Sequence, residues 1–212
     1  MNFEVCKNER EWIDCANDWL HQQSRNITPR PFRLFVPAGE TPRPLYRSWR
    51  ENPQLVDESI RLVQVDEILH NTERPFQKFF LDELPMFKPR FEFIDTAERG
   101  ADFAFLGLGM NGHIAFHEPS LPQKFYSGCL TLTDDTCARL HLPPNTRAVS
   151  YGANAFLKTK AIALLVRGLQ KKEILKRVLD AGAKKVESER QKLPASWLLD
   201  HPQMTIITDF QV

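Results

Sequence analysis

The amino-acid sequence predicts an α/β fold of the Rossmann-like, doubly wound type, in which helices cover both faces of a mostly parallel sheet. Two features of the sequence predict it. Short apolar, β-prone runs are each followed at once by polar or turn-forming residues, as expected of strands buried on both faces. Stretches with a helical spacing of apolar residues lie between these runs, and such alternation favours parallel strands joined by right-handed crossovers.

The chain has the organisation of one domain. Its 212 residues are enough for one sizeable core and few for two. No internal repeat, low-complexity tract or linker-like stretch interrupts it. We therefore expect a single domain that spans residues 1–212.

Five runs are predicted as strands. Each is rich in β-branched, aromatic or other large apolar residues, and each is followed by a turn-forming or polar residue such as Pro37 or Gly107. The predicted strands are residues 32–36, 62–65, 103–106, 161–166 and 205–208.

Five stretches between the strands are predicted as helices. Two carry start signals, Thr41 followed by Pro42 and Pro194 ahead of Ala195, because proline is common at the first helical position. Residues 130–152 mix strand-like, turn and proline-rich pieces and receive no assignment. The predicted helices are residues 9–22, 43–50, 73–84, 170–181 and 195–199, and the charged run 184–192 is expected to be a solvated loop or helix end.

The composition is that of a globular chain without a broad electrostatic field. Hydrophobic residues make up 42% and charged residues 26%, and 28 basic against 27 acidic side chains leave a formal net charge of +1. Such a balance attracts a phosphate backbone or an anionic membrane little, so we expect neither nucleic acid nor a membrane as partner. No apolar run reaches the roughly 20 residues that cross a bilayer, and the start lacks a signal peptide, which predicts a cytoplasmic protein.

The four cysteines indicate neither disulfides nor a metal site. Cys6, Cys15, Cys129 and Cys137 form no C-x-x-C pair and have no histidine at zinc-finger spacing. We expect reduced thiols, with Cys6 and Cys15 serving only to pack, and no bound metal.

Polar side chains follow the predicted strands. In an open parallel sheet, ligands bind beyond the carboxyl ends of the strands, at a topological switch point. Four separated segments are therefore expected to converge on one edge, where they supply carboxylates, an imidazole, a lysine and a Gly/Thr turn. The residues at these positions are Gly39, Glu40, Thr41, Asp66, Glu67, residues 110–113 and residues 167–171.

The strongest single signal lies in residues 106–119, LGLGMNGHIAFHEP. Its glycines match the dinucleotide fingerprint G-x-G-x-x-G, with Asp134 about 20 residues on in the place of the ribose-binding carboxylate. That fingerprint should open a helix, however, and the residues that follow make a poor first turn with Pro119 close behind. Nucleotide binding is therefore disfavoured.

A tight turn that presents a histidine and a carboxylate explains the segment better. The glycines let the backbone approach a ligand closely and present His113 and, five residues later, Glu118. The pKa of an imidazole suits proton transfer near neutral pH, and a carboxylate can orient it or take a proton itself. Taken singly, His113 is compatible with a core histidine, Asp66 with a solvated strand exit and Lys171 with a charged helix face. Their occurrence as one ordered set favours a functional site.

At these residues the sequence resembles the glucosamine-6-phosphate deaminase and 6-phosphogluconolactonase family. Deaminase members carry a segment G-x-G-x-D-G-H-I-A-F-N-E-P, which residues 107–119 follow closely. FVPAGETPRPLYRSW, QVDEIL and LLVRGLQKKEIL look like the phosphate loop, the acidic strand end and the late strand with its lysine, and PASWLLDHP resembles P-A-S-x-L-x-x-H-P. The resemblance spans nearly the whole chain. GHIAF followed by Glu-Pro points to the deaminases rather than the lactonases, whose stretch reads G-H-T-x-S-L-F-P.

The resemblance implies a catalytic role for three residues. Asp66 would be the general base that moves a proton between C2 and C1 of an open-chain sugar. His113 would open the ring by handling the proton of the ring oxygen and the anomeric hydroxyl, and Glu118 would tune it. The resemblance implies no metal and no organic cofactor.

It also implies a phosphate site. Lys171, with the loop at Gly39 and Thr41, would hold the phosphate through charge and through backbone N–H groups at a helix start. Glu40 departs from the pattern, because the loop normally has a second glycine there. A carboxylate aimed into the loop would repel phosphate, by about 4 kcal/mol at about 4 Å and an effective dielectric of about 20. Either Glu40 points away or the ligand differs.

Two further departures concern the catalytic half. Asn111 occupies the place of the family's aspartate, two residues before His113. Asparagine can hydrogen-bond but carries no charge, so the imidazole is expected to be harder to protonate; in a serine-protease triad such a change costs on the order of 10⁴ in turnover. The region after Thr136 looks shorter than the deaminase lid, and Arg139 is the candidate counterpart of the lid arginine.

We therefore expect a single sugar-phosphate isomerase/deaminase-like domain that catalyses aldose–ketose isomerisation of an amino-sugar phosphate, with or without loss of ammonia. Two alternatives stay open. One is lactone hydrolysis with His113 activating water, and the other is a catalytically weakened sugar-phosphate binding protein, as Asn111 and Glu40 suggest. In each case the expected partner is a small sugar phosphate, and the sequence indicates no oligomeric state.

Overall fold

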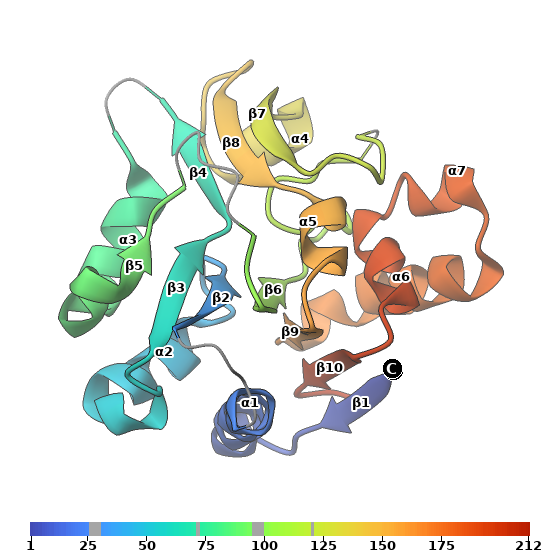
Figure 1. The fold of residues 1–212 in the computed structure, drawn as a ribbon. Helices are drawn as coiled ribbons and strands as arrows, with labels where there is room; N and C mark the ends of the chain where they lie inside the picture. The colour runs from blue at the N-terminus through green and yellow to red at the C-terminus, as the bar shows by residue number, and fades with distance from the viewer. Residues whose placement is uncertain (26–30, 71–72, 95–99, 120) are drawn as a thin grey trace.

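The centre of the fold is a seven-stranded parallel sheet. The computed structural model describes residues 1–25, 31–70, 73–94, 100–119 and 121–212. Within them the sheet has the order β1-β10-β9-β6-β2-β3-β5, and every neighbouring pair is parallel (Figure 1). The strands are β1 (Asn2–Val5), β2 (Phe32–Val36), β3 (Ile60–Gln64), β5 (Phe91–Glu92), β6 (Phe103–Gly107), β9 (Ala161–Val166) and β10 (Met204–Thr208).

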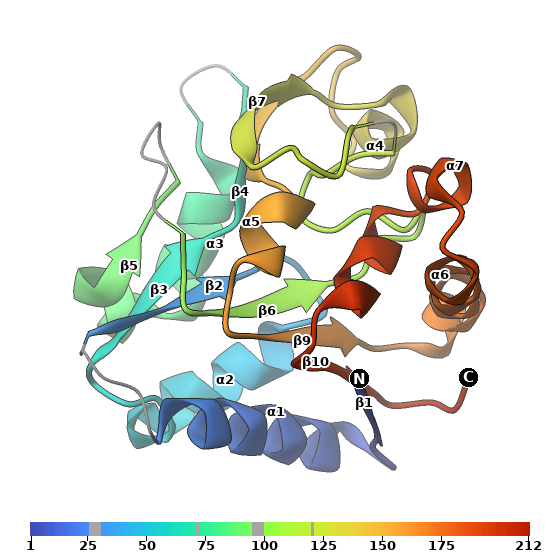
Figure 2. The ribbon, with the colours of Figure 1, turned by 45° about the vertical axis from the view of Figure 1, so that its right-hand side comes forward.

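Different helices cover the two faces of this sheet. Successive side chains of a strand point to opposite faces, so each face has its own core. Leu34 of β2 belongs to the core that contains Trp12 of α1 and Trp49 of α2, whereas Phe35 packs against Phe156 of α5. Figure 2 shows α1 and α2 below the sheet and α5 and α6 above it, so the predicted fold class is confirmed. The α-helices are α1 (Glu9–Ser24), α2 (Arg43–Glu51), α3 (Pro75–Glu83), α4 (Asp134–Arg139), α5 (Ala153–Leu157), α6 (Lys172–Lys184) and α7 (Glu187–Arg190).

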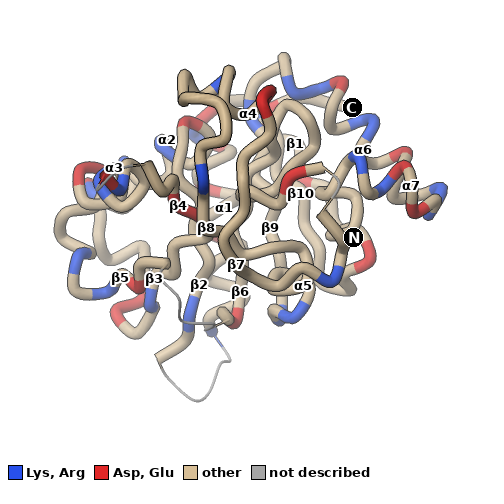
Figure 3. The backbone as a smooth tube through the Cα atoms, turned by 90° about the horizontal axis from the view of Figure 1, so that it is seen from above, with Lys and Arg blue, Asp and Glu red and all other residues tan. Residues whose placement is uncertain are grey.

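A second sheet of three antiparallel strands lies over the carboxyl edge of the main sheet. It consists of β4 (Asp66–Leu69), β8 (Arg147–Tyr151) and β7 (Ser127–Thr131), in the order β4-β8-β7. Strand β3 continues into β4 through Val65, whose carbonyl accepts a hydrogen bond of 2.9 Å from the N–H of Tyr151. In the view from above, these three strands overlie those of the main sheet (Figure 3).

The structure contains all five predicted strands, within two residues at each end. It adds β1, an exposed edge strand, and β5, which is two residues long. The segment 130–152, which received no assignment, holds the end of β7, α4 and β8. The predicted helix 195–199 was wrong in type, because these residues belong to a 3₁₀-helix, η4 (Pro194–Asp200). The remaining 3₁₀-helices are η1 (Pro53–Leu55), η2 (Pro85–Arg90) and η3 (Leu169–Lys171).

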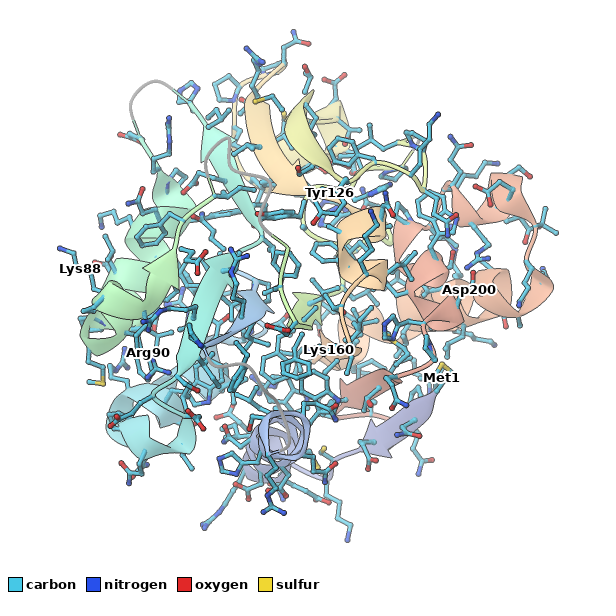
Figure 4. All side chains as sticks on the ribbon, in the orientation of Figure 1. Met1, Lys88, Arg90, Tyr126, Lys160 and Asp200 are labelled. Atoms are coloured by element: carbon cyan, nitrogen blue, oxygen red, sulfur yellow. The ribbon has the colours of Figure 1, made fainter. Side chains whose placement is uncertain are left out.

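The charged run 184–192 begins at the end of α6 and is mostly exposed, in agreement with the prediction. It also contains α7, whose Arg190 is an exception because it is buried. The guanidinium of Arg190 donates to Oδ2 of Asp200 at 2.6 Å and to the carbonyl of Ser196 at 3.0 Å. Figure 4 shows Asp200 among the C-terminal helices. A partly buried ion pair of this kind leaves no mark in a local charge pattern, because the two residues are ten positions apart.

The surface charge and the cysteines follow the expectations from composition. Lys and Arg are interspersed with Asp and Glu along the chain drawn in Figure 3. All four cysteines are free, and burial raises the pKa of the Cys6 thiol to about 12. No helix in the described ranges combines the length and apolarity needed to span a bilayer.

Glu67 joins the second sheet to α3. Its carboxylate is 1% exposed and accepts hydrogen bonds from the N–H groups of Ile68 (2.8 Å), Phe76 (3.0 Å) and Gln77 (2.7 Å). Nε2 of Gln64 donates a fourth bond at 3.0 Å. Phe76 and Gln77 stand at the start of α3, where backbone N–H groups have no partner within the helix and a negative charge is favourable. Glu67 therefore fixes the position of α3.

We expect Glu67→Ala to lower the free energy of unfolding by about 3 kcal/mol, because it leaves several buried donors without an acceptor. Urea denaturation followed by circular dichroism measures the change. Asp14→Ala, which removes an exposed carboxylate of α1, is the control and should change stability little. Equal stability of the two variants would contradict the assigned role.

Candidate functional site

A cavity of about 660 Å³ is lined by the loops that follow two neighbouring strands, β2 and β6. Strands β2 and β6 are neighbours, but β2 leads through α2 to β3 on one side and β6 leads to β9 on the other. This is the topological switch point at which open α/β sheets bind ligands. Seven of the nine residues predicted for the site line the cavity: Gly39, Glu40, Thr41, Asp66, His113, Arg139 and Lys171.

Asp66 stands at the junction of the two sheets. It is the first residue of β4, is 6% exposed, and pairs with Ser150 of β8 in the antiparallel ladder. Burial, and then the neighbouring charge of Glu67, raises the pKa of Asp66 well above its ordinary value. The two adjacent acids thus differ in role: Glu67 is saturated with hydrogen bonds, whereas Asp66 lines the cavity as a carboxylate with raised proton affinity.

The loop after β6 holds His113 by a tight turn. The N–H of Gly109 donates to the carbonyl of His113 at 2.9 Å, and the N–H of Gly112 donates to the carbonyl of Gly109 at 3.0 Å. Gly112 has φ +85°, a backbone conformation that favours glycine. A Cβ atom on residue 109 would lie 2.2 Å from the ring of His113, so the imidazole packs directly on the backbone of Gly109.

The imidazole of His113 is neutral at physiological pH. Burial, followed by the positive charges of Arg139 and Lys171, lowers the pKa of His113 to about 4. Asn111 accepts a hydrogen bond from the backbone N–H of His113 at 3.2 Å and leaves the ring untouched. Within the described ranges, Nδ1 of His113 is buried without a hydrogen-bond partner.

Glu118 and Asn111 do not line the cavity. Glu118 is 2% exposed, and its Oε2 accepts a bond of 3.2 Å from Oγ1 of Thr133. Burial raises the pKa of Glu118, an effect that nearby threonine hydroxyls, the charge of Arg139 and the amide of Asn111 partly offset. Nδ2 of Asn111 lies 3.5 Å from Oδ2 of Asp135. Asn111 therefore holds the loop of His113 through the backbone N–H of that residue, and Glu118 is joined to Thr133.

The second histidine of the same segment, His117, has no access to the cavity. It is 0% exposed; its Nδ1 accepts a hydrogen bond of 2.9 Å from the N–H of Ala153, and its Nε2 is 3.3 Å from the carbonyl of Leu121. Its ring also meets Trp197 edge to face, with ring centroids 5.2 Å apart. These contacts make His117 a structural residue that ties the loop to the start of α5.

The other end of the cavity has the features of an anion site. Nζ of Lys171 donates to Oγ1 of Thr41 at 2.9 Å and so reaches the loop that follows β2. Burial lowers the pKa of Lys171 to about 8, although the nearby carboxylate of Asp209 acts in the opposite direction. Gly39 has φ +110°, which favours glycine at this turn. In the part of the chain that the structure describes, the N–H groups of residues 39–41 find no acceptor, which leaves them available to an anion.

Glu40 and Arg139 line the cavity, but each is held in an ion pair. Oε1 of Glu40 accepts a hydrogen bond of 2.8 Å from Arg43, the first residue of α2, and the Glu40 side chain is 85% exposed. The charge of the Glu40 carboxylate is thus paired with that of Arg43. Arg139 forms an ion pair with Asp135, four residues earlier on α4.

The sequence analysis missed part of the cavity wall. Phe76 and Phe116 stack with ring centroids 5.6 Å apart and form an apolar side, and Asp209 closes the end near Lys171. Asp209 follows β10, so the strand-end rule applied to the fifth predicted strand would have found it. Phe76 carries no local signal, since only the capping of α3 by Glu67 brings it to the cavity. Among the described residues, no group of three or more His, Cys, Asp or Glu side chains is placed to hold a metal ion.

Comparison with known proteins gives a consistent result. The family model for glucosamine-6-phosphate isomerases and 6-phosphogluconolactonases matches residues 86–207. A glucosamine-6-phosphate deaminase of Lysinibacillus sphaericus is 33% identical over 151 residues, which are 66% of this chain and 65% of that protein. A glucosamine-6-phosphate deaminase of Bacillus cereus (strain B4264) is 28% identical over 237 residues, covering 99% of this chain and 87% of that protein.

Solved structures share the fold at lower identity. A monomeric glucosamine-6-phosphate deaminase superposes with a TM-score of 0.80 at 21% identity, covering 98% of this chain and 97% of the other. A 6-phosphogluconolactonase from Leishmania guyanensis gives a TM-score of 0.71 at 18% identity, covering 98% and 95%. At these identities the likeness is one of fold alone.

We expect Gly109→Ala to displace the imidazole of His113, because the new methyl group would occupy the volume of the ring. NMR of the histidine ring protons should show shifted His113 resonances. Gly107→Ala is the matched control two residues earlier, because a Cβ atom there meets nothing within 4 Å. An unchanged His113 signal in Gly109→Ala would show that the ring does not depend on the glycine.

Proposed function

The chain belongs to the family of glucosamine-6-phosphate isomerases and 6-phosphogluconolactonases, and on that basis we propose that it isomerises and deaminates an amino-sugar phosphate. One observation carries the proposal for this chain. A carboxylate with raised pKa, a neutral imidazole and a lysine bound to a phosphate-type loop line the same cavity. They provide a base, a ring-opening group and an anion site for one small ligand.

Asp66 is the proposed base of the isomerisation. In its ionised form it takes the proton from C2 of the open-chain 2-amino aldose and returns it to C1, so that the C2–H bond breaks and a C1–H bond forms. A proton passes from the amino nitrogen to O1, so that the C1 carbonyl becomes a hydroxyl and the C2–N bond becomes an imine, which one water molecule hydrolyses to a ketone and ammonia. The raised pKa of Asp66 favours this role, because a stronger base removes a weakly acidic C–H proton more readily.

His113 is the proposed ring-opening residue. A neutral imidazole can accept the proton of the anomeric hydroxyl and deliver a proton to the ring oxygen, which leaves the enzyme unchanged overall. Its buried Nδ1 has no partner among the described residues, so the ring is not committed to a competing structural role. Asn111 holds the loop through the backbone N–H of His113.

Lys171, Thr41 and the loop at Gly39 are the proposed phosphate site. Lys171 and residues 39–41 line the same cavity and are joined by the bond from Nζ of Lys171 to Thr41, and a phosphate monoester offers the acceptors that the ammonium and N–H groups need. Arg139 becomes available to the substrate only by leaving Asp135. The ion pair of Glu40 with Arg43 lowers the repulsion that a carboxylate in this loop would otherwise cause.

Two alternatives remain distinguishable by assay. A neutral His113 is also compatible with activation of water in lactone hydrolysis, and 6-phosphogluconolactone is the test substrate. A binding protein without catalysis would show thermal stabilisation by sugar phosphates without turnover. The proposed deamination consumes water and so places the enzyme among the hydrolases, and a cytoplasmic location stays a prediction.

We expect the protein to release ammonia from glucosamine 6-phosphate and Asp66→Asn to lower kcat by about 10² to 10⁴-fold, because the base is lost while the shape is kept. A coupled ammonia assay measures both. Since the pKa of Asp66 is raised, wild-type kcat should fall with decreasing pH through a value above the usual carboxylate range, before His113 titrates near 4. Wild-type protein without deaminase activity across hexosamine phosphates would remove the proposal, and an unimpaired Asp66→Asn would remove the role of Asp66.

We expect Lys171→Met to raise KM for the sugar phosphate by about 10 to 100-fold through loss of a charge-assisted hydrogen bond. The pKa of Lys171 is lowered to about 8, so its charge is present below that pH and lost above it. Wild-type KM should therefore rise above pH 8, while Lys171→Arg, which stays charged, should show no such rise. A KM that is independent of residue 171 would place the phosphate elsewhere.

A further inference from the structure

Asn111 makes one contact that a carboxylate in its place could not make, the hydrogen bond that its Nδ2 donates. Its Oδ1 accepts a hydrogen bond of 3.2 Å from the N–H of His113, and its Nδ2 donates to Oδ2 of Asp135 at 3.5 Å. Its amide is also among the donors near Glu118 that counter the effect of burial on the pKa of that group. The amide nitrogen of Asn111 therefore lies near two carboxylates at once.

The charged residues around Asn111 interact with one another. Asp135 accepts from Asn111 and forms an ion pair with Arg139, whose charge also acts on Glu118 and His113. An aspartate at position 111 would place a third carboxylate beside Glu118 and Asp135 and would offer no donor to either. Like charges in such proximity destabilise one another and raise carboxylate pKa values. The amide fits because Asp135 already carries the negative charge.

We propose that residues 111 and 135 act as a pair, one amide and one carboxylate, that joins the loop of His113 to α4, with Asn111 as a positioning residue. The amide comes from the loop after β6, and the carboxylate, which is exposed, comes from the first turn of α4. On this basis Asn111 is compatible with full activity. The inference rests on the proposed function for its kinetic readout, although the pairing itself is a property of the fold.

Four proteins test the pair: the wild type, Asn111→Asp with two carboxylates, Asp135→Asn with none, and the double variant with the two residues exchanged. We expect each single variant to lower kcat about tenfold and the double variant to recover to within about threefold of wild type, as for strongly coupled neighbours. Release of Arg139 by Asp135→Asn would alter KM instead, so the coupling is evaluated in kcat. Additive losses in the double variant, or a gain of activity in Asn111→Asp alone, would overturn the proposal.

Asp134 provides a matched control. It is an exposed carboxylate next to Asp135 in the first turn of α4 and does not line the cavity. Asp134→Asn should leave kcat unchanged, and Asn111→Asp combined with Asp134→Asn should stay as impaired as Asn111→Asp. This combination has the same net charge as the exchanged pair but the wrong placement. Recovery in it would show that net charge, rather than the pairing, is responsible.

A readout without turnover separates this proposal from the proposed function. The same four variants are compared by thermal denaturation at pH 8, where all the carboxylates are ionised in the unfolded chain. We expect Asn111→Asp to lower Tm and the additional Asp135→Asn change to restore most of the loss. If the wild type proves inactive but this coupling in Tm is present, the function is wrong and the pair is right. If the wild type is active and neither kcat nor Tm shows coupling, the pair is wrong.

Discussion

The site depends on the parallel pairing of β2 with β6 in the middle of the main sheet. Leu34 and Phe35 of β2 stand in register with Phe103 and Ala104 of β6, and beyond this pairing the chain turns to opposite sides. The loops that follow the two strands therefore separate and leave a cavity between them. Gly39 enters it from one strand and His113 from the other.

Desolvation governs the chemistry of this cavity. Asp66, His113 and Lys171 all shift toward their neutral forms, because burial disfavours a charge whatever its sign. The shifts are useful for different reasons in each case. A carboxylate becomes more basic, an imidazole stays available as an acceptor, and an ammonium group gains more from an arriving phosphate than an exposed one would.

Of two neighbouring residues with similar side chains, one is held by hydrogen bonds in the interior and the other lines the cavity. Glu67 is saturated with hydrogen bonds at the start of α3, while Asp66 beside it lines the cavity. His117 uses both ring nitrogens in the interior, while His113 keeps its ring at the cavity. Residues 111 and 135 instead lie on two elements, with the hydrogen-bond donor on one and the charge on the other.

The sequence by itself determined five of the seven strands of the main sheet, the class of fold and the residues at the strand ends. These follow from local patterns. An apolar run such as Ala161–Val166 favours a buried strand, whichever strands pair with it. Gly39 and Gly112 mark turns because their positive φ is unfavourable for residues with a Cβ atom. Only the tertiary structure decided that Glu67 caps α3, that Phe76 enters the cavity, and that Asp135 contacts Asn111. Those contacts join segments 9 to 24 residues apart, and their energies come from burial and charge at close range. Sequence patterns do not predict these contacts, because the residues come within hydrogen-bonding distance only after the sheets and helices have packed.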